Sequence, residues 1–226
     1  MSSSGHLALV PRLLGWPYAQ LPGGVRKSFE VAVHAGSAPV LALAAARGPR
    51  LDLRGVALTL APAAAGGLLF ESQIEERLGS ARSVAIAQIA AGAVLIAADL
   101  RRPRRTRVRR RDQLAVGLAQ AAALVPGVSR SGAAISAARL SGLDRRGASA
   151  LALSSALPVT LGASLLKGSR LAAGGVPPHL YGSMAAGAGA AFASALVSLP
   201  LARRSPPLRA VGLYRIALGL LCVRRA

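Results

Sequence analysis

The chain has 226 residues, of which 53% are hydrophobic, and its formal net charge at pH 7 is +20. Its only cysteine, Cys222, excludes an intrachain disulfide and a thiolate metal cluster. Eight arginines crowd into Arg101–Arg111, and most others occupy short gaps between apolar segments. A nucleic-acid-binding domain would gather such charge on one soluble face, so this placement argues against nucleic acid and is typical of cytoplasmic loops in a membrane protein.

The first polar cluster in chain order is Ser2–His6. Hydroxyls, a glycine and an imidazole are groups that can bind a phosphate ester, transfer a proton or attack phosphorus. Polar groups in a hydrophobic chain are costly unless they are paired, so we expect this cluster to be functional. The alternative for His6 is an ordinary histidine at a frayed chain end.

Hydrophobic stretches then recur at residues 31–46, 55–70, 83–100, 148–167, 181–202 and 209–223. At about 1.5 Å per residue, the longer ones cross the roughly 25–30 Å of hydrocarbon in a bilayer. They predict an all-α integral membrane protein, a polytopic bundle of about six spans with additional re-entrant helices. Glu30 immediately precedes the first stretch, and we interpret it as a residue that favours a helix N-terminus. We interpret His34, inside the stretch, as a packing or interhelical hydrogen-bonding residue.

The second polar cluster, Pro126–Gly132, lies mid-chain and centres on Arg130. A guanidinium offers a planar fork to phosphate oxygens and stays charged at any relevant pH. Hydroxyls and closely approachable backbone amides flank it, from Gly127, Ser129, Ser131 and Gly132. The alternative is a loop arginine that extends to the membrane surface, but Arg130 lies far from the basic loop.

The order of parts repeats along the chain, although chance similarity in an alanine-rich sequence is the alternative. Ser4-Gly5 is followed ten residues later by Leu14-Gly15, and Ser131-Gly132 is followed ten residues later by Ser141-Gly142. We predict a single membrane domain, 1–226, built as an inverted-topology repeat. Its parts are a first half over 1–100, a basic cytoplasmic loop over 101–112 and a second half over 113–226.

At the two polar clusters the chain resembles the bacterial undecaprenyl-diphosphatase family, the bacitracin-resistance type that recycles the cell-wall carrier lipid. Ser2–His6 resembles the family's serine-rich segment ending in Gly-His, and Gly117–Gly132 resembles its long second signature. Shorter matches extend the resemblance over essentially the whole chain, including Phe29–Val31, Gly36-Ser37, Ala61-Pro62, Leu157-Pro158 and Tyr214–Ile216.

The resemblance implies hydrolysis of undecaprenyl diphosphate to the monophosphate and phosphate, in the bacterial plasma membrane, with the site reached from the extracytoplasmic face. It implies that Ser3, His6 and Arg130 are catalytic. The implied phosphate-binding residues are Ser4, Gly5, Gly127, Ser129, Ser131 and Gly132. Whether His6 or Ser3 is the nucleophile stays open, as does the oligomeric state.

The resemblance also implies a divalent cation, Mg²⁺ or Ca²⁺, held by glutamates in a helix upstream of the serine segment. We find no metal ligands of this kind in the chain, so we expect the first half to be N-terminally truncated and this form to be nearly inactive. A second departure is Ala134, where the family usually has threonine.

Two further interpretations fit the same pattern, a lipid transporter and an inactive remnant, and a third does not. Inverted repeats with broken helices are typical of transporters, so a lipid flippase or transporter is the main alternative. An acid-phosphatase-like lipid phosphatase needs a histidine soon after its Ser-Arg element, and here the first histidine after Arg130 is His179. An inactive remnant of a phosphatase is the remaining interpretation.

Overall fold

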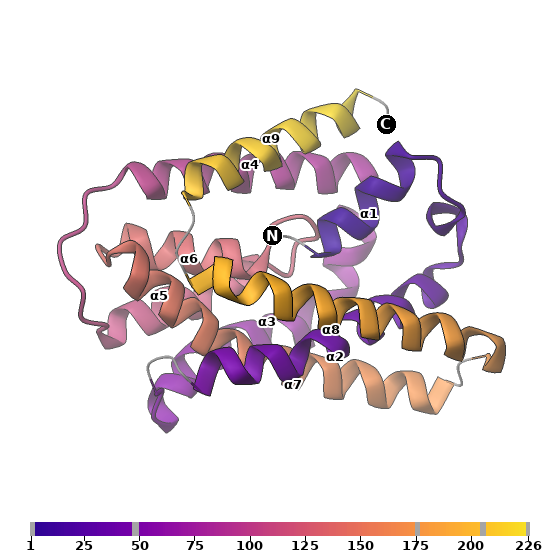
Figure 1. Cartoon of the computed structure of the whole chain (residues 1–226), viewed down its shortest axis with the longest axis horizontal. Coiled ribbons are helices and arrows are strands. Elements are labelled where there is room, and N and C mark those ends of the chain that lie inside the picture. The colour runs from indigo at the N-terminus through magenta and orange to yellow at the C-terminus, as the bar shows by residue number, and fades with distance from the viewer. Residues whose placement is uncertain (1–2, 47–49, 175–176, 204–206, 225–226) are drawn as a thin grey trace.

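The computed structural model describes residues 3–46, 50–174, 177–203 and 207–224, and within these ranges the chain is almost entirely helical (Figure 1). The prediction of an all-α fold is confirmed. The α-helices are α1 Ser3–Leu13, α2 Gly23–Ala46, α3 Leu53–Leu78, α4 Ala81–Leu100, α5 Arg110–Ala122, α6 Arg130–Leu140, α7 Arg145–Gly174, α8 Tyr181–Arg203 and α9 Leu208–Val223. Two short 3-10 helices, Pro17–Gln20 and Pro178–Leu180, precede α2 and α8.

The six apolar stretches of the sequence fall within α2, α3, α4, α7, α8 and α9. Four segments of the described chain are long and apolar enough to cross a membrane: Gly23–Ala46, Leu53–Leu78, Ala81–Leu100 and Pro178–Pro200. The last helix, α9, has only 16 residues. Large apolar side chains point outward, with Leu68 65% and Val197 80% exposed. Such a surface suits a lipid environment and would be a liability in water.

Ion pairs gather the ends of several helices at one end of the bundle. Asp52 pairs with Arg110 and joins the starts of α3 and α5. Asp99, buried at the end of α4, accepts from Arg145 Nε at 2.6 Å and so joins the start of α7. The hydrogen bond from Arg110 holds the pKa of Asp52 well below its usual range.

The basic loop is fastened to this same end. Arg105 pairs with Asp112, which is buried near the start of α5, and its guanidinium also donates to the carbonyl of Ser141 at 2.9 Å. Arg139 donates to the carbonyl of Leu143 at 2.6 Å. The loop over 101–109 therefore lies beside the end of α6 and the start of α7.

Helices α2 and α7 run in opposite directions. Lys27 pairs with Glu75, which places the start of α2 beside the end of α3. This contact lies away from the end of the bundle that holds Asp52, Asp99 and Asp112, called here the aspartate-rich end. The start of α7 lies at the aspartate-rich end, so α2 and α7 run antiparallel, as Figure 1 shows. The short helices α1 and α6 both span 11 residues, and left-handed glycines follow them, Gly15 at φ +66° and Gly142 at φ +100°.

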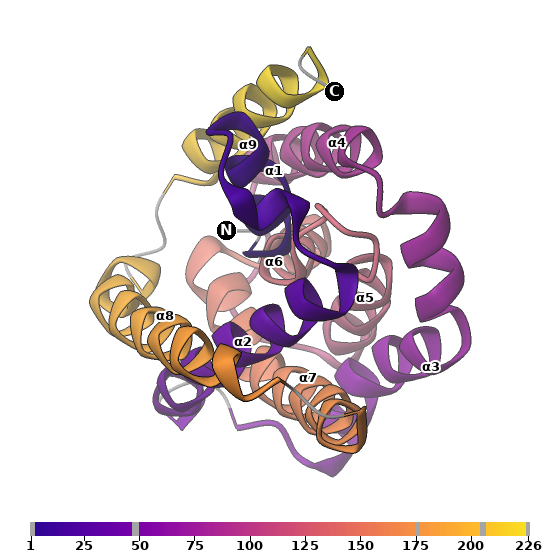
Figure 2. The ribbon, with the colours of Figure 1, turned by 90° about the vertical axis from the view of Figure 1, so that its right-hand side faces the viewer.

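Helices α4 and α9 pack closely against each other and lie side by side in Figure 1 and Figure 2. A Cβ atom added to Gly212 would lie 2.8 Å from the carbonyl oxygen of Gly92. Small residues at a membrane helix interface allow backbones to approach this closely. This contact sets the position of α9, and with it the side chains that α9 contributes to the site.

The bundle predicts which segments are reached from each side of the membrane. Single-cysteine labels within Arg101–Arg111 are expected to react with an impermeant thiol reagent only from the cytoplasm, because loop arginines are retained there. Labels at residues 72–80, near the opposite end of α3, are expected to react only from outside. Reaction of both sets from one side would overturn this topology.

Candidate functional site

The serine segment forms the start of α1 and contacts α2. Ser3 is the first residue of that helix, is exposed, and its hydroxyl oxygen lies 2.9 Å from Nε2 of His34. Ser4 is partly buried and Gly5 is fully buried. Of these residues the structure thus leaves the Ser3 hydroxyl open to an incoming ligand while α2 holds it.

His6 lies one turn further along α1 and contacts α9 instead. Its Nε2 is 2.8 Å from the hydroxyl of Tyr214, and the two rings stack with centroids 5.6 Å apart. This pair joins residues 208 positions apart in the chain. Because both the hydrogen bond and the ring contact restrain the imidazole, His6 is held in one orientation despite its place near the chain end.

The second cluster is a tight loop with two residues in left-handed backbone conformation. Gly127 has φ +99°, and a Cβ atom there would lie 2.5 Å from the carbonyl oxygen of Val84. Ser129 has φ +47°, which is uncommon for a residue with a side chain. Its hydroxyl accepts from the amide of Gly132 at 3.2 Å and lies 3.4 Å from that of Ser131. Strain of this kind concentrates where a loop must hold a ligand.

Arg130 begins α6, immediately after this loop. Its Nη1 donates to Oγ1 of Thr160 on α7 at 3.2 Å. Across the described part of the chain, no carboxylate forms an ion pair with it. The first amides of a helix lack partners within that helix and carry a partial positive charge. A guanidinium at this position makes the start of α6 suited to a phosphate group.

Two consecutive residues of α9 contact the two polar clusters. Tyr214 contacts His6, and Nη2 of the neighbouring Arg215 donates to the carbonyl of Gly127 at 2.6 Å. Arg215 is only 1% exposed. Within the ranges that the structure describes, no carboxylate pairs with it either. The arginine therefore holds the loop by a hydrogen bond, and within the described ranges no carboxylate balances its charge.

Helix α4 also contacts α1 and the loop before Arg130. Val84 packs with Leu9 of α1, and its carbonyl lies against Gly127 of the loop. Helices α1 and α6 both pack against α4. The two clusters, over a hundred residues apart in sequence, are thus held against the same two helices.

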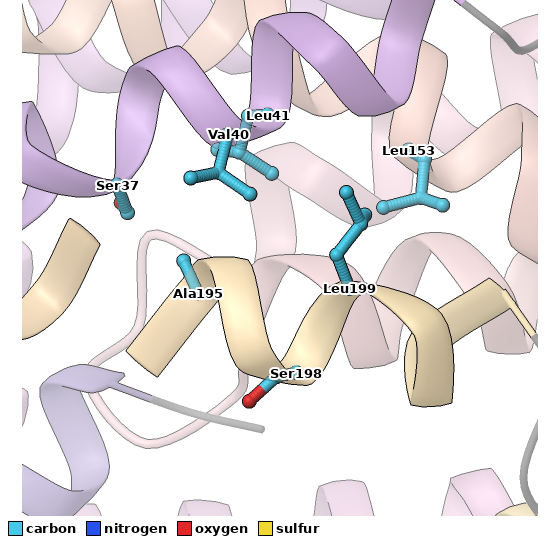
Figure 3. A pocket seen from close by; sticks show the side chains of 7 residues that line it. All are labelled: Ser37, Val40, Leu41, Leu153, Ala195, Ser198 and Leu199. Atoms are coloured by element: carbon cyan, nitrogen blue, oxygen red, sulfur yellow. The ribbon is translucent and has the colours of Figure 1, made fainter. Parts of the chain in front are cut away.

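An apolar hollow lies close to the Ser3 and His34 pair. Its volume is about 150 Å³, and α2, α7 and α8 form its walls (Figure 3). The lining residues are Ser37, Val40, Leu41, Leu153, Ala195, Ser198 and Leu199. Ser37 donates to the carbonyl of His34 at 2.9 Å, so the hollow begins within one turn of the polar pair.

Sequence reasoning missed two residues of this site: Thr160 attracted no attention, and Arg215 entered only through the family resemblance. His34 was expected to pack or to form an interhelical hydrogen bond, and it forms such a bond with Ser3 of α1. The signal available was chemical: an ionisable side chain inside an apolar helix is costly and marks a functional position. Gln88 carries the same signal, since it is fully buried on α4 and neither amide atom has a partner in the structure.

The gathered residues do not fit a divalent cation. Among residues 3–46, 50–174, 177–203 and 207–224, no three His, Cys, Asp or Glu side chains lie together as a metal site would need. The two clusters offer hydroxyls, imidazoles and guanidiniums, whereas Mg²⁺ and Ca²⁺ take mainly carboxylate and carbonyl oxygens. We therefore derive no catalytic step through a cation.

Removal of a single oxygen atom tests the contact between His6 and α9. Tyr214→Phe removes the hydroxyl but keeps the stacked ring, so we expect the chain to fold normally and its catalytic turnover to fall about 5-fold, since a net hydrogen bond is worth about 1 kcal/mol. Turnover by the purified variant measures this. Unchanged turnover would mean that the hydroxyl does not position His6.

Comparison with known proteins gives a consistent result. A family model described as bacitracin resistance protein BacA matches residues 1–221. An undecaprenyl-diphosphatase of Geobacter sulfurreducens is 36% identical, over 90% of this chain and 82% of the relative. That of Chromohalobacter salexigens is 35% identical, over 97% of this chain and 90% of the relative. That of Geotalea daltonii is 32% identical, over 99% and 90% respectively.

Proposed function

The chain belongs to the bacitracin resistance protein BacA family, and from this premise we propose that it hydrolyses undecaprenyl diphosphate to undecaprenyl monophosphate and phosphate. One observation carries the proposal at the site itself. Adjacent residues of α9 contact both clusters: Tyr214 meets His6 of the serine segment, and Arg215 donates to Gly127 of the loop before Arg130. The result is a set of hydroxyls, imidazoles and guanidiniums that matches a phosphate ester.

Arg130 is the residue we assign to the transferring phosphate. Its guanidinium, the hydroxyls of Ser129 and Ser131, and the first amides of α6 all supply donors to phosphate oxygens. Negative charge on these oxygens changes during phosphoryl transfer, and fixed donors in a dry site stabilise it strongly. The Ser3 hydroxyl and the His6 imidazole are groups that can attack phosphorus or transfer a proton.

The prenyl tail requires an apolar path next to the diphosphate. The hollow between α2, α7 and α8 offers such a path, because its lining is mainly apolar and it begins one turn from His34. Its volume of about 150 Å³ suits the first part of a chain, and the exposed apolar faces of the helices can accompany the rest.

We further propose that the site opens to the extracytoplasmic face. Gly127 lies against Val84, near the start of α4, whereas Asp99 and the basic loop lie at the other end of that helix. If the basic loop is cytoplasmic, as retained positive charge indicates, the polar clusters face the opposite side.

The main alternative is a lipid transporter, and one pair of assays separates the two. Although the resemblance implies low activity for this form, the protein in detergent, supplied with Mg²⁺ or Ca²⁺, is expected to release measurable inorganic phosphate from undecaprenyl diphosphate. In sealed vesicles, movement of undecaprenyl phosphate across the bilayer without phosphate release would favour transport and contradict the phosphatase.

A further inference from the structure

We propose that His34 is the proton acceptor for the Ser3 hydroxyl, which makes Ser3 the nucleophile. The proposal rests on the proposed function for the identity of the substrate, and it adds a catalytic group on α2. It starts from a chain of two hydrogen bonds, from Ser3 to His34 and from His34 to the carbonyl of Glu30.

The second of these bonds decides which ring nitrogen of His34 carries the proton. Nδ1 lies 2.8 Å from the carbonyl oxygen of Glu30, and a carbonyl oxygen can only accept. The neutral imidazole must therefore hold its hydrogen on Nδ1 and present a lone pair at Nε2. Ser3 Oγ lies 2.9 Å from that lone pair, so the serine hydroxyl donates to it. This is the geometry of a serine activated by a histidine base that a third group orients.

The other histidine of the site contacts a phenol. Nε2 of His6 meets the phenol of Tyr214, which can donate or accept, so this bond leaves the tautomer of His6 open. His34 also lies inside the long helix α2, whereas His6 belongs to the short helix α1. Positioning within about 1 Å decides catalytic rates, and the hydrogen bond to the carbonyl of Glu30 fixes the ring of His34.

The reaction balances with these groups. Ser3 Oγ forms a bond to the terminal phosphorus as the bond from that phosphorus to the bridging oxygen breaks. The hydroxyl proton moves to Nε2 of His34 and then to the departing undecaprenyl monophosphate. Water next attacks the phosphoserine and gives one proton to Nε2, the bond from phosphorus to Oγ breaks, and Nε2 returns the proton to Ser3.

A fluorophosphonate probe tests the pair without relying on the natural substrate. Attack by Ser3 Oγ displaces fluoride and leaves a phosphonylated serine, which peptide mass spectrometry locates. We expect labelling at Ser3 in the parent protein and at least 10-fold slower labelling in His34→Ala. His179→Ala, in an exposed turn, is the matched control and should label at the parent rate.

Turnover provides a second measurement. We expect kcat of His34→Ala to fall about 10²–10⁴-fold, the range for loss of a general base, with KM nearly unchanged. Added imidazole should restore part of this rate in His34→Ala and none in Ser3→Ala. A histidine that only packs α1 against α2 would not respond to imidazole.

The outcomes separate this proposal from the proposed function. Absence of Ser3 labelling in the parent, or equal labelling of the parent and His34→Ala, overturns the proposal. Labelling that depends on His34, in a protein that releases no phosphate from undecaprenyl diphosphate, upholds the pair and refutes the assigned substrate.

Discussion

Arg130→Lys is expected to lower kcat for phosphate release about 100-fold or more, in line with removal of a transition-state charge donor. Lysine keeps the positive charge, but an ammonium cannot offer two parallel donors to one phosphate. It also lacks the planar guanidinium, which can donate to Thr160 through one nitrogen and to a phosphate through the others. Phosphate release from undecaprenyl diphosphate by the purified variant measures the effect.

The control for this substitution is Arg77→Lys, at the exposed end of α3, which should keep the parent rate. Thermal unfolding in detergent checks that both variants fold. Near-normal turnover of a well-folded Arg130→Lys protein would show that Arg130 is a structural residue at the start of α6.

Arg215→Met is expected to abolish most activity while leaving the stability of the protein unchanged or higher. The loop loses its support at Gly127, so the donors around Arg130 lose their position, and we expect turnover to fall about 100-fold. Stability has two opposing contributions. Loss of the hydrogen bond costs about 1–3 kcal/mol. Removal of a buried guanidinium without an ionic partner recovers several kcal/mol of desolvation.

Arg224→Met is the matched control, since Arg224 is exposed just beyond the end of the same helix. It should change neither turnover nor the unfolding temperature. A large drop in the unfolding temperature of Arg215→Met would instead identify Arg215 as a residue required for folding. Its buried charge would then have a structural role and would not indicate a phosphate site.

The predicted helices and both polar clusters follow from local properties of the chain. Six apolar stretches lie in helices because each is long enough to satisfy its own backbone hydrogen bonds in a bilayer. Arg130 and the residues around it stand out because hydroxyls, glycines and a guanidinium are costly in apolar surroundings without a ligand. These inferences need only the order of residues and the cost of burying polar groups.

Partners within the site depend on contacts that no local pattern contains. Ser3 and His34 are 31 positions apart, Arg130 and Thr160 are 30 apart, and Tyr214 reaches His6 across 208. A histidine within an apolar helix looks the same whether it packs or accepts a proton, until the atoms facing its two nitrogens are known.

By itself, the sequence determined the helical membrane fold, the two polar clusters and the resemblance that names their chemistry, because composition and motif act locally. Only the tertiary structure decided that α9 joins the clusters, that Arg215 supports the Gly127 loop, and that His34 faces Ser3. The physical reason is that a side chain's role depends on the donors, acceptors and charges around it, and packing of distant helices supplies these.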